Sequence, residues 1–118
     1  MELKRVVITG VGALTPIGNN REEYWSNLAK GTNGAGPITR FDPEKFRTKF
    51  ACEIKNFDIL DHLNRKEIRK MDPNTQFGMV VGEEAIKDCG INLETIDKDS
   101  VGVIWGSGIG GLKTFQEE

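Results

Sequence analysis

Cysteine and histidine are nearly absent from this 118-residue sequence, which has two cysteines and one histidine. Two cysteines are too few for a disulfide-stabilised fold and indicate a reducing, cytoplasmic setting. The spacing of these residues does not fit a metal site, so we expect no metal. His62 lies in a polar stretch and is expected to be solvated or to cap a helix. Cys52 and Cys89 occupy apolar positions and are expected to be small core residues rather than nucleophiles.

Long hydrophobic runs and an excess of one charge are also missing. No apolar run approaches the roughly 18 residues of a membrane span, and the N-terminus lacks the cleavage site of a signal peptide. The 16 basic and 18 acidic residues give a formal net charge of −2, which argues against a generally basic nucleic-acid binder. A mean hydropathy of −0.41 is low for a self-sufficient core, although the chain is too apolar to be disordered.

Glycine is the residue in excess, at 14 of 118, or about 12% against a usual ~7%. It is concentrated near the two ends of the chain, after short apolar segments. Residues 3–9 form a continuous apolar run of the kind found in strands covered on both faces, and they lead into Gly10. Residues 101–105 form a second such run, which leads into the glycine-rich segment 106–111. We therefore predict a parallel sheet in an α/β fold.

Capping signals predict three helices between these two strands. Each helix follows an Asn or Asp that can accept backbone N–H bonds, and the first and third precede a glycine suited to a helix end. Their expected ranges are 21–30, 65–71 and 73–89. The apolar residues expected to face inward are Tyr24, Trp25, Leu28 and Ala29 on the first helix, and Phe77, Val80, Val81, Ala85 and Cys89 on the third.

Two weaker signals complete the predicted fold. Residues 46–54 partly alternate between apolar and polar side chains, which predicts a short edge strand. Gly78 and Gly82 lie four residues apart inside the third helix, where each should cost ~1 kcal/mol relative to alanine. We expect another element to pack closely against them.

The second glycine turn, residues 106–111, matches G-x-G-x-x-G through Gly106, Gly108 and Gly111. Because it follows a predicted strand, one hypothesis is a dinucleotide site at a helix N-terminus. The confirming acidic residue would lie about twenty positions on, past residue 118. The alternative is a tight turn that lets a backbone or an apolar ligand approach closely. The first turn, residues 10–16, fails the same pattern because a threonine replaces the third glycine.

A compact group of charges occupies residues 65–70, with four cations and one anion. At helical spacing these cations form one surface on a net-acidic chain. It is either a solvated face or a docking surface for a phosphate or an acidic partner protein. Aromatic residues do not interleave with the charges, which argues against nucleic-acid stacking.

Three blocks together resemble one family: RVVITGVGALTPIGNN at 5–20, TKFACEIKNF and NRKEIRKMD at 48–57 and 64–72, and VGVIWGSGIGG at 101–111. The chain resembles the N-terminal part of the bacterial β-ketoacyl-acyl carrier protein synthases of type II, the elongating condensing enzymes of fatty acid synthesis. The resemblance implies a thiolase-like fold of layered α/β halves that pair as homodimers. Residues 1–118 are then expected to be the N-terminal portion of the first half, with the remainder outside this chain.

The resemblance also implies a chemistry and a set of sites. Members load an acyl chain onto a cysteine, and two histidines assist decarboxylation of the malonyl-carrier. These catalytic residues lie in motifs beyond residue 118, so we expect none in this chain, and we expect the chain alone to be inactive. Lys66, Arg69 and Lys70 match the basic helix that docks acyl carrier protein. Ile109 matches a residue that lines the acyl-chain pocket near the dimer interface.

No cofactor is expected, because the substrates arrive on the phosphopantetheine of the carrier. Two alternatives to the condensing enzyme stay open from the sequence. One is a dinucleotide-binding fragment of an oxidoreductase that uses the turn at 106–111. The other is a noncatalytic module that binds an acyl carrier through its basic helix.

Overall fold

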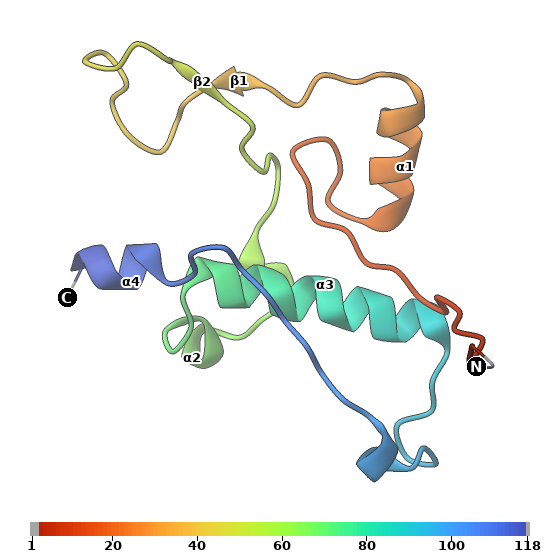
Figure 1. The fold of residues 1–118 in the computed structure, drawn as a ribbon. Helices are drawn as coiled ribbons and strands as arrows, with labels where there is room; N and C mark the ends of the chain where they lie inside the picture. The colour runs from red at the N-terminus through yellow and green to blue at the C-terminus, as the bar shows by residue number, and fades with distance from the viewer. Residues whose placement is uncertain (1–2, 118) are drawn as a thin grey trace.

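The computed structural model describes residues 3–117 and places one long helix, α3, at the centre of the molecule (Figure 1). The other segments are arranged around it, with α2 and α4 near its N-terminal end. Short 3-10 turns lie at Ile59–Asp61 and Lys98–Ser100. The regular elements are α1 (Arg21–Ala29), β1 (Gly36–Pro37), β2 (Phe50–Ala51), α2 (Arg65–Ile68), α3 (Pro73–Cys89) and α4 (Leu112–Glu117).

The helix boundaries follow the capping residues. Asn20 caps α1 by accepting the N–H of Glu23, and Asp72 caps α3 by accepting the N–H of Asn74. Gly90 ends α3 in the left-handed conformation, at φ 67°. The predicted starts of all three helices are therefore confirmed. The second helix is shorter than predicted and ends at Ile68, because the chain turns there to begin α3 at Pro73.

The predicted parallel sheet is not formed within residues 3–117. The segments 3–9 and 101–105 have no backbone ladder, and their apolar side chains are exposed, Val6 at 87% and Ile104 at 98%. A sheet forms only through hydrogen bonds between neighbouring strands, and neither segment is paired in this way within the described residues. The sheet in the described chain is the antiparallel pair of β1 and β2, two residues each. The predicted edge strand at 46–54 is thus reduced to β2.

Close packing on α3 explains several of the glycines. A Cβ on Gly12 would lie 2.2 Å from the carbonyl oxygen of Val81, so the first glycine turn lies directly on α3. A Cβ on Gly78 would lie 2.8 Å from the ring of Trp105, which confirms the expected close approach there. A Cβ on Gly82 would meet no other element of the described residues within 4 Å, and for that residue the expectation is wrong.

Burial is low for a chain of this length. The radius of gyration is 17.6 Å, whereas a compact domain of 118 residues would have about 13.5 Å. Val80 is the buried apolar residue of the described chain. The rest of the predicted inward face of α3 is half-buried, which confirms that this face is the packed one. The structure thus presents much of its apolar surface uncovered.

Four burial predictions are wrong. Trp25 and Leu28 of α1 are exposed, at 68% and 46%, and so is Ala29, because no element of the described residues covers that side of the helix. Cys52 is exposed rather than in a core, since the strand expected to carry it inward ends one residue earlier. Within the described residues, no helix combines the length and the apolar character needed to cross a bilayer.

Candidate functional site

The predicted docking cations lie together on one exposed corner of the molecule, where α2 turns into α3. Asn64 and Glu67 form a capping box that starts α2. Lys66 is exposed on this short helix, and Arg69 and Lys70 are exposed immediately after it. In the described residues, the four ion pairs involve other cations, so the α2 charges point to solvent without a carboxylate partner.

A buried amide fixes this corner to the central helix. Gln76 of α3 is 8% exposed, and its side-chain amide donates to the carbonyl oxygens of Ile68 and Met71 at 3.2 and 2.8 Å. These carbonyls belong to the last residue of α2 and to the turn that follows it. Because the buried Gln76 side chain binds both carbonyl groups, it holds the backbone that carries Arg69 and Lys70 in one conformation.

A polar groove of about 490 Å³ lies beside these cations. It is formed where the end of α2, the start of α3 and the helix α4 meet (Figure 1). The residues that line it are Ile68, Arg69, Lys70, Met71, Asp72, Pro73, Gln76, Lys113, Thr114 and Glu117.

Asp72 joins α3 and α4 in this groove. One carboxylate oxygen caps α3 through the N–H of Asn74 at 3.0 Å. The other accepts both the N–H and the hydroxyl of Thr114 in α4, at 3.1 and 3.0 Å. These hydrogen bonds, from Asn74 first and then from Thr114, lower the pKa of Asp72 below its ordinary value, and the nearby charge of Lys113 adds to the effect.

The second glycine turn reaches the same end of α3. A Cβ on Gly110 would lie 2.8 Å from the side-chain amide of Asn74, so the turn passes close to the first turn of α3. Gly111 has a φ of 74°, which glycine adopts readily, and α4 begins at the next residue. Ile109 is 74% exposed in this turn. The structure thus brings the predicted docking residues and the segment of Ile109 to one end of the central helix.

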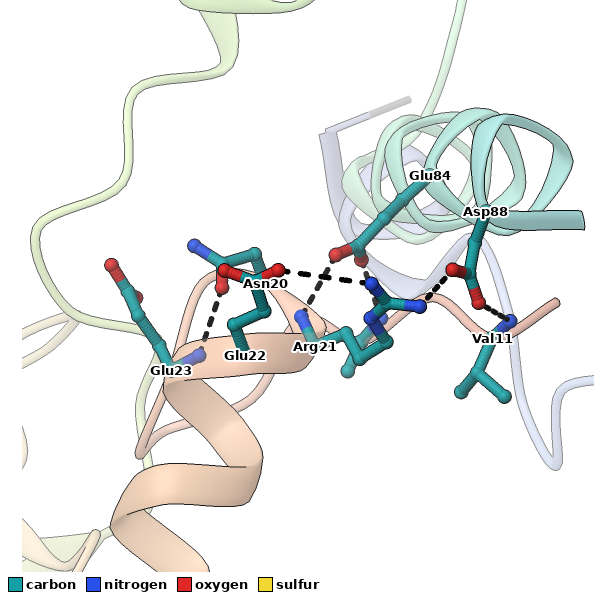
Figure 2. Close-up of polar contacts among 8 residues, drawn as sticks. Val11, Asn20, Arg21, Glu22, Glu23, Glu84 and Asp88 are labelled. Atoms are coloured by element: carbon teal, nitrogen blue, oxygen red, sulfur yellow. Dashed lines mark hydrogen bonds and ion pairs between the residues drawn. The ribbon is translucent and has the colours of Figure 1, made fainter. Parts of the chain in front are cut away.

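A second polar cluster, which the sequence reasoning missed, lies toward the other end of α3 (Figure 2). Glu84 accepts the N–H groups of Ala13 and Arg21, at 2.7 and 2.8 Å. Asp88 accepts the N–H of Val11 at 2.9 Å and pairs with the guanidinium of Arg21. The sequence signal was the pair of acids spaced i,i+4 on the packed side of α3.

This second cluster binds backbone rather than a ligand. Its carboxylates accept N–H groups of the first glycine turn and of α1, which would otherwise lack partners beside the helix. A cluster of this kind fastens segments together and contains no nucleophile. We therefore regard it as structural.

Histidine and cysteine are not brought together. His62 is exposed, follows the 3-10 turn at 59–61, and stacks on Phe57 with ring centroids 5.2 Å apart. The expectation of a solvated or capping histidine is confirmed. The thiol of Cys89 donates to the carbonyl oxygen of Ile86 at 3.0 Å. In the part of the chain that the structure describes, no group of three or more metal-ligating residues is found.

Comparison with known proteins decides the family. Residues 3–118 match the family described as "Beta-ketoacyl synthase, N-terminal domain". The chain belongs to this family. The resemblance drawn from the three sequence blocks is thereby confirmed.

Two similar relatives of this ketoacyl synthase chain share one name. It is 50% identical over 113 residues to "3-oxoacyl-[acyl-carrier-protein] synthase 2" of Staphylococcus aureus (strain COL), covering 96% of this chain and 27% of that protein. It is 44% identical over 118 residues to the Synechocystis sp. (strain ATCC 27184 / PCC 6803 / Kazusa) protein of the same name, covering 100% of this chain and 28% of the relative. The chain thus spans little more than a quarter of the length of these relatives.

A solved structure supports the predicted fold class. "The ishigamide ketosynthase/chain length factor" matches with a TM-score of 0.68 and 34% identity, over 75% of this chain and 22% of that one. The α/β, thiolase-like fold expected from the sequence is therefore confirmed at the level of the family, although the described residues form no parallel sheet of their own.

Proposed function

We propose that this chain forms the N-terminal portion of the first thiolase-like half of an elongating 3-oxoacyl-acyl carrier protein synthase. The observation that supports this most strongly is the 50% identity over 113 residues to relatives of that name. The complete enzyme would take an acyl group onto a cysteine, decarboxylate malonyl-carrier, and join the resulting carbanion to the acyl thioester. The product is a 3-oxoacyl-carrier, and carbon dioxide is released.

The uncovered apolar surface supports this assignment. Ile8 is 87% exposed and Val103 is 90% exposed, in two extended segments whose composition suits buried strands. Surfaces of this kind are stable when further protein covers them. The remainder of the synthase would supply that cover and would also carry the catalytic cysteine and histidines, while residues 1–118 contribute none of these.

Within this enzyme, Lys66, Arg69 and Lys70 would dock the acidic surface of acyl carrier protein. The support is their shared exposure on one corner and the absence of carboxylate partners within residues 3–117. Such a charged surface speeds the encounter with an oppositely charged partner and favours the correct orientation. The same docking would bring the carrier to the end of α3 beside which the second glycine turn passes.

Ile109 would line the acyl-chain pocket. Its side chain is 74% exposed in the described chain, so it can meet a ligand or further protein. The proposal includes a homodimeric, cytoplasmic enzyme without metal or organic cofactor, whose substrates arrive on phosphopantetheine. The relatives named above are synthases rather than oxidoreductases, so the dinucleotide hypothesis is not retained.

The test is a condensation assay on the full-length protein with malonyl-carrier and a series of acyl-carriers of increasing chain length. We expect carbon dioxide release and a 3-oxoacyl-carrier two carbons longer than the acyl donor. Ile109→Phe should shift the accepted donors toward shorter chains, because the larger ring would fill the distal part of the pocket. No condensation with any donor would refute the function, and an unchanged chain-length profile would refute the role of Ile109.

A further inference from the structure

The groove beside the docking corner contains a cation that the family resemblance did not assign. Lys113, in the first turn of α4, lines the same groove as Arg69 and Lys70. In Figure 1, α2 and α4 lie at the same end of α3. Lys113 is 62% exposed, so its ammonium group is available to a partner.

The position of Lys113 relative to α2 is fixed by its neighbour in the chain. Thr114 donates both its N–H and its hydroxyl to Asp72. Asp72 follows Lys70 by two residues and caps α3. The cations that follow α2, Arg69 and Lys70, and the cation of α4, Lys113, are therefore held beside one groove through the carboxylate of Asp72.

The carboxylates in the groove do not balance its cations, because Asp72 and Glu117 face three basic residues, Arg69, Lys70 and Lys113. Asp72 already accepts hydrogen bonds on both oxygens, from backbone and hydroxyl donors. Glu117 pairs with Lys113 at 3.7 Å, and both side chains are more than 60% exposed. Exposed i,i+4 pairs of this kind contribute only about 0.3–0.5 kcal/mol, so a partner's carboxylate can replace Glu117.

The geometry points to Lys113 as a fourth cation of the carrier-docking surface. Glu117 is then an internal carboxylate that pairs with Lys113 when no carrier is bound. The partner is an acidic protein surface whose carboxylates span from the α2 corner to α4. This inference rests on the proposed function and deepens it, since it extends the docking surface to a second element.

The experiment measures the KM for malonyl-carrier in the full-length synthase at low ionic strength. Lys113→Ala should raise this KM about threefold with kcat unchanged, an effect in the range of one exposed charge pair. Glu117→Gln should lower it by about twofold, because Lys113 then lacks its internal competitor. In the double variant, Lys113→Ala with Glu117→Gln, the second substitution should no longer lower the KM. Lys98→Ala removes an exposed lysine outside the groove and is the matched control.

The outcomes separate this inference from the proposed function. If Arg69→Ala raises the KM while Lys113→Ala behaves like Lys98→Ala, the inference is overturned and the docking role of α2 stands. If Glu117→Gln lowers the KM equally with and without Lys113, the competition between them is also refuted. If Arg69→Ala leaves the KM unchanged as well, the proposed docking surface itself is wrong.

Discussion

The two glycine turns of this chain are built from similar sequences but are held in very different ways. The first, at 10–16, lies directly on α3, and Glu84 and Asp88 accept its backbone N–H groups. The second, at 106–111, touches α3 mainly at Asn74 and leaves most of its surface open. The same pattern of apolar run and glycines thus serves as scaffold in one place and as accessible surface in the other.

This difference between the two turns follows from the atoms that lie next to their glycines. In the first turn the glycines are needed because a helix backbone occupies the space of a side chain, as at Gly12. In the second, Gly106 and Gly108 have no neighbour within 4 Å among the described residues. A turn that is not filled by its own chain remains available to a substrate or to another part of the protein.

The largest effect should come from filling the space at the first turn. Gly12→Ala would place a Cβ 2.2 Å from the carbonyl oxygen of Val81, so either the turn or α3 must shift. We expect a loss of about 2–3 kcal/mol, at the upper end for overpacking. The measurement is the midpoint of urea unfolding of the full-length protein.

Gly36→Ala is the matched control for this substitution. A Cβ at Gly36 would meet only the flexible end of the Lys55 side chain, at 3.8 Å. It should change stability by less than about 0.5 kcal/mol. Equal unfolding midpoints for the two variants would contradict the scaffold role of the first turn.

A smaller and more local effect is expected in α4, which follows the second glycine turn. Thr114→Val removes the hydroxyl that donates to Asp72 but keeps the backbone N–H. We expect faster amide exchange in α4, with little change in the unfolding midpoint of the whole protein. Protection of α4 in the variant equal to that in the wild type would show that the hydroxyl does not hold the helix.

The same contact should depend on pH in a defined direction. Because the pKa of Asp72 is lowered in the folded chain, its stabilising contribution is present above its ordinary pKa and is lost as the pH falls through the lowered value. Protection of α4 in the wild type should therefore persist on mild acidification. It should decline only below the ordinary range of an aspartate.

Local features of the fold could be predicted from the sequence. Asn20, Asp72 and Gly90 mark helix ends by short-range chemistry, and each lies where it was expected. The shared surface of Lys66, Arg69 and Lys70 could also be predicted, because residues three and four positions apart in a helical segment lie on one side. Ile109 and the catalytic roles depended on the family resemblance rather than on spacing.

The remaining features depend on long-range contacts that spacing does not encode. The segments 3–9 and 101–105 have the composition of strands but no neighbour within residues 3–117 to pair with. The link from Thr114 to Asp72 joins residues 42 positions apart. The contacts of Glu84 with the first glycine turn similarly required the packing of two distant segments.

The most direct test of the docking role compares two double charge reversals, one on the α2 corner and one elsewhere on the surface, by their effect on association with acyl carrier protein. Lys66→Glu with Arg69→Glu reverses two charges on the α2 corner, and Lys30→Glu with Lys98→Glu reverses two exposed charges outside the groove. At low ionic strength we expect the first pair to slow association with acyl carrier protein by about tenfold or more and to reduce its salt dependence, with the control near wild type. Equal association rates for both pairs would contradict the docking role of α2.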